Sequence, residues 1–239
     1  MDIKDIFIEL TSCTTPTGSE TDIEEYLPSI YKNDPYGNYY IQVGYSNTMF
    51  TSHLDNKCDE KEDVIHQFIG NKIKTDGFTI LGADDKSGVS IMINMIDNEI
   101  PGLYYFFIGE ENGRIGSKRL KEYLLSNQDE TFSNIDKVIS FDRQGYNDIV
   151  TYQLGERGCS DQFADKISTE LNKFDFEYQS TKDGSYSDSH SFIGIFPECV
   201  NISVGYFNEH FTNEYQDIEF LQKLSDTCCE IDWDDILIQ

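Results

Sequence analysis

Apolar residues recur at two spacings along the chain, and these spacings separate predicted strands from predicted helices. Short continuous apolar runs predict buried strands, and apolar positions three or four residues apart predict amphipathic helices. The predicted strands are 39–45, 48–52, 103–109, 136–142 and 199–206, with a hairpin over 65–80 that turns near Gly70 and Asn71. The predicted helices are 2–10, 19–31, 85–98, 116–128, 160–174 and 217–231. Ser19 with Asp22 three residues later resembles a capping box, so the second helix is expected to begin there.

The alternation of strands and helices predicts the α/β class. Runs such as "LYYFFIG" (103–109) are apolar without interruption, as expected of strands that are covered on both faces. We therefore expect a mostly parallel, twisted central sheet flanked by helices on both faces. No internal repeat, low-complexity tract or Pro/Gly-rich linker divides the sequence, so one domain over residues 1–239 is the simplest organisation.

The strongly negative net charge of the chain argues against some classes of binding partner. The sequence holds 18 Lys and Arg against 44 Asp and Glu, a formal net charge of −26. Such a surface repels nucleic acid and anionic membranes and attracts cations. There is no basic start followed by an apolar core, and no apolar run approaches the ~18 residues of a membrane span. We expect a cytoplasmic protein without a signal peptide. Its six scattered cysteines, none in a CxxC pattern, are expected to be reduced.

Histidines and carboxylates gather where predicted strands end or a helix begins. In sheets of this class, ligands bind at the carboxyl ends of strands. Five segments carry such residues: His53 and Asp55, Asp84 and Asp85, Glu110 and Glu111, Asp142, and Glu209 with His210. A lone His-x-Asp pair usually marks a solvated corner, but five segments at one rim favour a common role. Adjacent acids also repel one another, and a bound cation removes that cost.

The residue types indicate which metals would bind. One residue from each segment gives the set His, Asp, Glu, Asp, His, which offers nitrogen and oxygen ligands and no thiolate. This set suits zinc, with manganese or cobalt as alternatives, better than calcium. Five ligands exceed what one tetrahedral catalytic zinc takes, and they suit two metals if one carboxylate bridges.

The candidate residues lie in five motifs: "SHLDNK" (52–57), "LGADDKSGV" (81–89), "IGEENGRIGS" (108–117), "SFD" (140–142) and "NEHFTNE" (208–214). Together these motifs resemble the co-catalytic di-zinc exopeptidases, the group that includes peptidase T, related di- and tripeptidases and bacterial zinc aminopeptidases. Each motif alone is weak, but their order makes the resemblance strong, and it runs from about Pro16 to Glu214. The resemblance implies the α/β fold of zinc exopeptidases and a hydrolase that cleaves small peptides through a water activated by two zinc ions.

The resemblance also implies a role for the motif residues. The implied ligands are His53 and Asp142 for one metal, Glu111 and His210 for the other, and Asp84 bridging both. Asp85 is the alternative bridging ligand. Asp55 would hold His53 in the metal-binding tautomer. Glu110 would be the general base, taking a proton from the water and passing it to the leaving amine. The family often has a cis peptide bond after the bridging aspartate.

The spacing of the motifs leaves no room for the lid or dimerisation domain of many relatives. Only 67 residues separate Asp142 from His210, and 30 separate His53 from Asp84. This resembles the lidless aminopeptidase branch. The opening segments "TPTGSETDIEEYL" (15–27) and "DPYGNYYI" (34–41), in contrast, resemble the lidded peptidase T branch. In lidded relatives a histidine of the extra domain helps to stabilise the oxyanion, so we expect another donor here.

The segment "SYSDSHSF" (185–192) resembles a late motif of the aminopeptidase branch and is expected to form a loop over the site. We predict that Tyr186 or His190 donates a hydrogen bond to the oxyanion, while Asp188 orients the donor or binds the substrate amine. In the alternative interpretation, the loop only caps the sheet. Arg143, which follows a ligand, is expected to form an ion pair, with contact to a substrate carboxylate as the alternative.

These inferences predict a metal-dependent exopeptidase, with an aminopeptidase or small-peptide peptidase favoured. A carboxypeptidase or an N-acyl amino acid amidohydrolase would use the same site, and an inactive binding homologue is a further alternative. The enzymes differ in which end of the substrate they anchor: acidic groups bind an amine, and Arg or Lys binds a carboxylate. The scarcity of basic residues favours the amine. The expected partner is a small peptide, and the oligomeric state stays open, with a monomer as one alternative.

Overall fold

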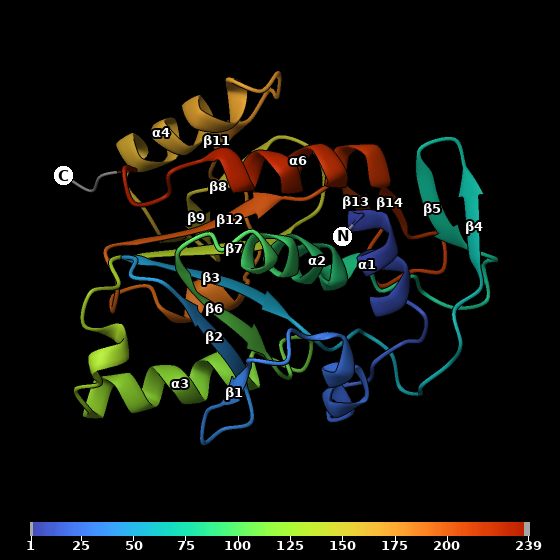
Figure 1. The fold of residues 1–239 in the computed structure, drawn as a ribbon, viewed down its shortest axis with the longest axis horizontal. Coiled ribbons are helices and arrows are strands. Elements are labelled where there is room, and N and C mark those ends of the chain that lie inside the picture. The colour runs from blue at the N-terminus through green and yellow to red at the C-terminus, as the bar shows by residue number, and fades with distance from the viewer. Residues whose placement is uncertain (1, 237–239) are drawn as a thin grey trace.

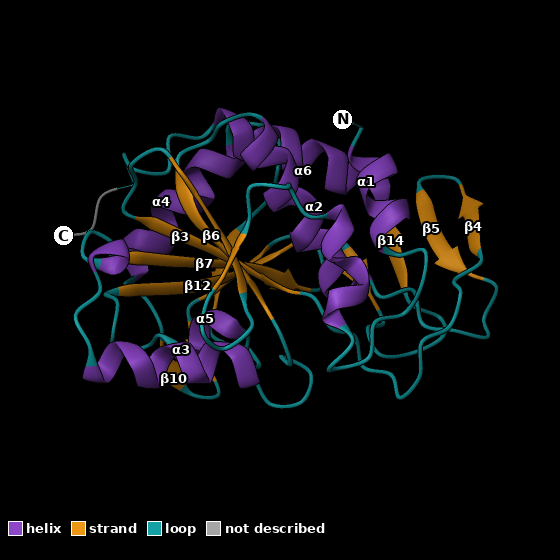
Figure 2. Cartoon of the chain, turned by 60° about the horizontal axis from the view of Figure 1, so that its bottom comes forward, coloured by secondary structure: helices purple, strands orange, loops and turns teal. Residues whose placement is uncertain are grey.

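A large twisted sheet forms the centre of the molecule in the computed structural model, which describes residues 2–236. Its eight strands follow the order β1-β2-β6-β3-β7-β12-β8-β11, and they fan out across the sheet in Figure 2. The strands are β1 (Lys32–Asn33), β2 (Tyr39–Val43), β3 (Thr48–His53), β6 (Gly102–Phe107), β7 (Lys137–Arg143), β8 (Asp148–Val150), β11 (Gln179–Thr181) and β12 (Glu198–Ser203).

The four central strands of this sheet are parallel. β6, β3, β7 and β12 pair in parallel with their neighbours, whereas β2 pairs antiparallel with β6 and β8 pairs antiparallel with β12. The sheet is therefore mixed, with a parallel centre. Because parallel neighbours end at the same edge, β3, β6 and β7 deliver their last residues side by side.

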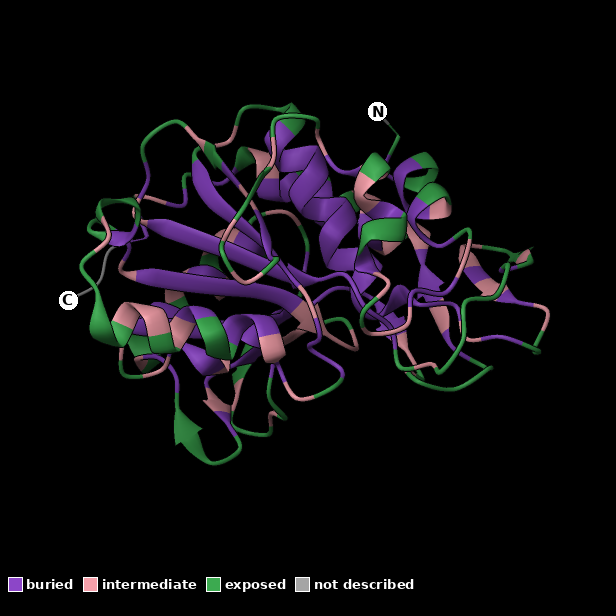
Figure 3. Cartoon of the chain, turned by 90° about the horizontal axis from the view of Figure 1, so that it is seen from below, coloured by how far each residue is buried: buried purple, intermediate pink, exposed green. Residues whose placement is uncertain are grey.

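Side chains of the central strands alternate between two apolar cores, one on each face of the sheet. In β3, Phe50 packs into one core and Met49 into the other. Every residue of β3, β6 and β12 is buried, which accounts for their uninterrupted apolar runs. Figure 3 shows these strands buried between partly exposed helices.

Helices cover both faces of the sheet, as predicted. The first core is covered by α1 (Ile3–Leu10), α2 (Ala83–Asp97), α4 (Asp161–Asn172) and α6 (Ile218–Glu230). The second core is covered by α3 (Ile115–Ser126) and the short α5 (Asp188–Ser191). The two sets lie on opposite sides of the strands (Figures 1 and 2). Within residues 2–236, no helix is both long and apolar enough to span a membrane.

A smaller four-stranded sheet lies beside the large one. It joins the predicted hairpin, β4 (His66–Ile69) and β5 (Lys72–Thr75), to β13 (Tyr206–Phe207) and β14 (Tyr215–Asp217) in the order β13-β14-β5-β4. The hairpin extends away from the main body in Figure 1. This sheet braces the loop between β13 and β14, which carries His210.

Several local expectations differ from the structure. The predicted helix over 19–31 is a 3₁₀ helix, η1 (Glu20–Tyr26), and the Ser19 side chain makes no cap hydrogen bond. Glu20 instead accepts hydrogen bonds from the backbone of Gly18 and Gly109, which ties the segment to the end of β6. The apolar pattern also does not predict the short elements η2 (Glu130–Phe132), β1, β8, β9 (Tyr152–Gln153), β10 (Glu156–Arg157), β11 and α5.

Candidate metal centre

The start of α2 presents Asp84 and Asp85, the two adjacent aspartates of the second predicted segment. The peptide bond between Asp84 and Asp85 is cis, as the resemblance implied. Glu214 fixes this turn, because its carboxylate accepts hydrogen bonds from the backbone N–H groups of Leu81, Gly82 and Asp84 at 2.8, 2.8 and 3.1 Å. The Asp84 carboxylate faces His53 and His210, whereas the Asp85 carboxylate faces backbone N–H groups.

Close approach of α2 to the strand ends depends on Gly88. A Cβ atom at this position would lie 2.3 Å from both the Phe141 backbone oxygen and Ser52 Oγ. Glycine therefore permits the first turn of α2 to sit directly against β3 and β7. Asp85, fully buried, accepts hydrogen bonds from the backbone of His53 and Gly88, each at 3.2 Å.

His53 ends β3 and presents Nε2 to the site. Its Nδ1 lies 2.9 Å from the backbone oxygen of Asp55 and 3.6 Å from the Asp55 carboxylate. An Nδ1–H donated to that carbonyl leaves Nε2 free for a metal. The Asp55 carboxylate instead accepts from the backbone N–H groups of Glu110 and Glu111 at 3.0 and 3.3 Å. Asp55 thus links two of the predicted segments through both its backbone and its side chain.

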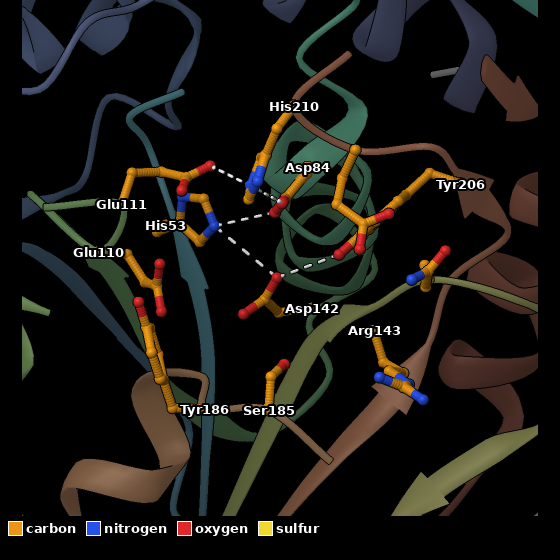
Figure 4. A pocket seen from close by; sticks show the side chains of 12 residues that line it. His53, Asp84, Glu110, Glu111, Asp142, Arg143, Ser185, Tyr186, Tyr206 and His210 are labelled. Carbon is orange, nitrogen blue, oxygen red and sulfur yellow. Dashed lines mark hydrogen bonds and ion pairs between the residues drawn. The ribbon is translucent and has the colours of Figure 1, made fainter. Parts of the chain in front are cut away.

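The five implied ligands form two groups that share one carboxylate. In each group the ligand atoms lie within 4.8 Å of one another: His53, Asp84 and Asp142 in one, and Asp84, Glu111 and His210 in the other. His53 Nε2 lies 3.0 Å from Asp84 Oδ1, and His210 Nε2 lies 3.1 Å from Asp84 Oδ2 and 2.9 Å from Glu111 Oε1 (Figure 4). Each oxygen of Asp84 therefore faces a different histidine.

The electrostatics of the cluster favour positive charge. Burial lowers the pKa of His53, but the nearby carboxylates of Asp142, Asp55 and Asp84 outweigh it and hold that pKa well above its usual value. Hydrogen bonds to Asp84 and Glu111 raise the pKa of His210 to about 10. Burial raises the pKa of Asp142 to about 8. Buried carboxylates held this close need cations to offset their repulsion, so the donor set fits a pair of divalent metal ions.

The backbones of Asp142 and His210, two further implied ligands, each have a distinctive local geometry. Asn201 of β12 pairs with both backbone groups of Asp142, accepting from its N–H at 2.9 Å and donating to its carbonyl oxygen at 2.7 Å. His210 has a φ of 68°, in the left-handed region that few non-glycine residues adopt. Residues held in such conformations cluster at functional sites.

Glu110 lines the same cavity as the ligands but belongs to neither group. It is 5% exposed, and burial raises the pKa of its carboxyl group well above the usual value. Its backbone is fixed by Asp55, and its side chain lies between the ligand cluster and Tyr186 in Figure 4. This is a position from which a carboxylate could exchange a proton with a group held at the ligand cluster.

The three residues predicted from segment 185–192 lie in different places. Tyr186 lines the cavity and stacks on the Arg114 guanidinium, whose carbon lies 4.7 Å from the ring centroid. His190 is not among the lining residues; its Nδ1 contacts Arg114 Nη1, and its Nε2 lies 3.3 Å from Glu156 Oε2. Asp188 does not line the cavity either: it is buried in α5, and no hydrogen bond reaches its carboxylate oxygens within residues 2–236. Burial raises its pKa to about 6.

Sequence reasoning missed some residues of the site. The hydroxyl of Tyr206 lies 3.3 Å from Asp142 Oδ1, and its side chain lines the cavity. Glu214 anchors the Asp84 turn, a role that its place at the end of "NEHFTNE" does not reveal. Both lie within four residues of His210 in the sequence, so their proximity to an assigned ligand was the available signal.

Known proteins share this fold. No family model matches the sequence. A stretch of 85 residues, 32% of this chain, is 39% identical to the uncharacterized protein YqjE of Bacillus subtilis (strain 168), and it spans only 22% of that protein. Among solved structures, the aminopeptidase PepT of Bacillus cereus ATCC 10987 has a TM-score of 0.78 at 17% identity, with 95% of this chain and 96% of that chain covered.

Two further solved peptidases are similar over the same extent. A tripeptidase of Staphylococcus aureus subsp. aureus Mu50 has a TM-score of 0.71 at 16% identity, with 96% of each chain covered. The TET1 peptidase of Pyrococcus horikoshii, which can assemble into a tetrahedron or a large octahedral shell, has a TM-score of 0.69 at 16% identity, with 95% of this chain and 98% of that chain covered. At these identities the likeness shows the fold alone, and the predicted α/β fold, which these peptidases share, is confirmed.

Proposed function

We propose that this protein is a metal-dependent exopeptidase that hydrolyses small peptides, acting as an aminopeptidase. The observation that carries the proposal is the pair of ligand groups sharing Asp84, with Glu110 beside them in one cavity. The likeness in fold to an aminopeptidase and a tripeptidase supports it. The proposed metals are two zinc ions, with manganese or cobalt as alternatives that the same ligands would accept.

The ligand groups assign one metal to His53 and Asp142, the other to Glu111 and His210, and both to Asp84. When bound, such ions polarise the scissile carbonyl and lower the pKa of a water toward neutrality. The chain's own residues supply the remaining steps. Glu110 takes a proton on its carboxylate from the attacking water and then gives it to the leaving amine. Burial of Glu110 favours its protonated form, which suits the second transfer.

An inactive binding homologue would be expected to lack a ligand or the base. All five ligands and Glu110 are present in this chain, and their side chains converge (Figure 4). The convergence supports an enzyme. A test of activity therefore needs only metal and a suitable peptide.

Zinc content tests the proposal most directly. Protein purified without chelator and supplied with zinc is expected to approach two zinc ions per chain, because the ligands form two groups around one shared carboxylate. Elemental analysis measures the ratio, and turnover of dipeptides and amino-acid p-nitroanilides measures activity. A firm plateau at one zinc or none would contradict the two-metal site, and a fully loaded protein without turnover would contradict the enzyme.

Tyr186 is our proposed donor to the oxyanion, because it lines the cavity and His190 does not. Replacing it with Phe removes only the hydroxyl, so the ring can still stack on Arg114. Loss of one such donor typically lowers kcat by ~10²–10³. His190→Ala is expected to have a smaller effect, transmitted through Arg114. Both variants are compared at saturating substrate with zinc content verified; a kcat for Tyr186→Phe within a few-fold of wild type would leave the oxyanion to the metals alone.

A further inference from the structure

Two oppositely charged side chains, Arg143 and Glu209, line the cavity in addition to the proposed ligands and Glu110. Arg143 already has acceptors. Its Nε and Nη2 donate to Asp148 Oδ2 at 3.1 and 3.0 Å, and Nη2 also donates to the backbone oxygen of Asp183 at 3.1 Å. The carboxylate of Asp148 therefore offsets the one guanidinium that lines this cavity among residues 2–236 and could have held a substrate carboxylate.

Glu209 is in the opposite situation. It is half-buried and directly precedes His210, a proposed ligand. Across residues 2–236, no side chain forms a hydrogen bond or ion pair with its carboxylate, and the positive charges that act on it are those of His210 and Arg143. A partly buried carboxylate that lines a cavity without a side-chain donor is suited to a cationic partner. The metals would not need it, because the two ligand groups are complete without Glu209.

The place of Glu209 suits one particular cation. In the first residue of a peptide, only the α-carbon separates the ammonium nitrogen from the carbonyl carbon that an aminopeptidase attacks. A group that anchors this ammonium must therefore share the cavity with the residues that hold the carbonyl. Glu209 meets this requirement because it lines the cavity with His53, Asp84 and Glu110.

We propose that the Glu209 carboxylate binds the free N-terminal ammonium of the substrate and so restricts the site to peptides with an unblocked amine. The inference rests on the proposed peptidase function and specifies its substrate class. It also distinguishes an aminopeptidase from the two alternative enzymes. A carboxypeptidase anchors the substrate carboxylate, and an N-acyl amino acid amidohydrolase accepts a blocked amine. Glu209 acts in specificity, with no part in proton transfer.

Steady-state kinetics with paired peptides tests the role of Glu209. Glu209→Gln is expected to raise KM for a free dipeptide such as Ala-Ala by about tenfold or more, the scale of one charge-assisted hydrogen bond, with a smaller change in kcat. The preference for Ala-Ala over N-acetyl-Ala-Ala should fall by a similar factor. Glu209→Asp keeps the charge and should retain most of the preference. Glu177→Gln, which removes an exposed acid remote in sequence, should behave as wild type.

A binding measurement separates this inference from the proposed function. Calorimetry with Ala-Ala on the zinc-loaded Glu110→Gln protein reads affinity without turnover, and adding Glu209→Gln should weaken Kd about tenfold or more. Equal Kd values, or an unchanged preference for the free amine, would overturn the inference and leave the peptidase standing. Loss of zinc from Glu209→Gln would assign the residue to the metal site and also overturn it. If the wild type cleaves no peptide, the proposed function fails, and the calorimetry still decides whether Glu209 binds the amine.

Discussion

Replacing Glu110 with Gln is expected to lower kcat by ~10² or more while both metals stay bound. Glu110 lines the cavity but contributes to neither ligand group, and the amide preserves the shape of the side chain. Because a glutamine cannot take a proton from the attacking water, the chemical step should fail while the substrate still binds. Turnover of an amino-acid p-nitroanilide and elemental analysis on the same preparation measure both quantities.

Glu111→Gln provides the matched control for this experiment. Glu111 is the next residue in the chain, and its backbone N–H is held by the same Asp55 carboxylate. Its side chain, however, belongs to the group with Asp84 and His210, so its loss should reduce zinc content as well as activity. Near-wild-type turnover by Glu110→Gln would show that another group is the base. Loss of zinc from both variants would show that the two adjacent acids do not have separate roles.

The fold was predictable where local pattern and burial agree. The strands β3, β6, β7 and β12 are covered on both faces, so their apolar runs are continuous and unambiguous. The edge of the sheet was harder. β8 and β11 have only three residues each, too few to show a pattern. The segment of the 3₁₀ helix Glu20–Tyr26 was predicted as a longer helix because Ser19 and Asp22 resemble a capping box, whereas Glu20 in fact holds the end of β6.

The site was predictable because residues of the same types, histidines and carboxylates, occur in several separate segments. Histidines and carboxylates at successive strand ends pointed to a common rim, and the motif order suggested how they divide. Sequence could not show which atoms meet. His53 Nδ1 lies nearer the backbone oxygen of Asp55 than its carboxylate. Likewise, "SYSDSHSF" gave Tyr186 and His190 equal standing, and only the cavity lining separates them.

Asp84→Asn is expected to remove both zinc ions, the largest loss that a single ligand change should cause. Its two oxygens face different histidines, at 3.0 Å for His53 and 3.1 Å for His210, so each proposed metal depends on it. Asp142→Asn should remove only the metal held with His53. Zinc that binds the folded state stabilises it by about 2.7 kcal/mol at a free concentration 100 times Kd. Zinc should therefore raise the Tm of the wild type and leave that of Asp84→Asn unchanged.

Asp85→Asn distinguishes the two adjacent aspartates. Asp85 is fully buried and accepts from the backbone N–H groups of His53 and Gly88, so its carboxylate is occupied in holding α2 against β3. An amide would turn its NH₂ group toward one of those donors and leave a buried N–H without an acceptor. That change should lower the free energy of unfolding by about 1–3 kcal/mol. Zinc content, by contrast, should stay near the wild-type value, because Asp85 belongs to neither ligand group. Zinc lost from Asp85→Asn but kept by Asp84→Asn would make Asp85 the bridging ligand and reverse the assignment.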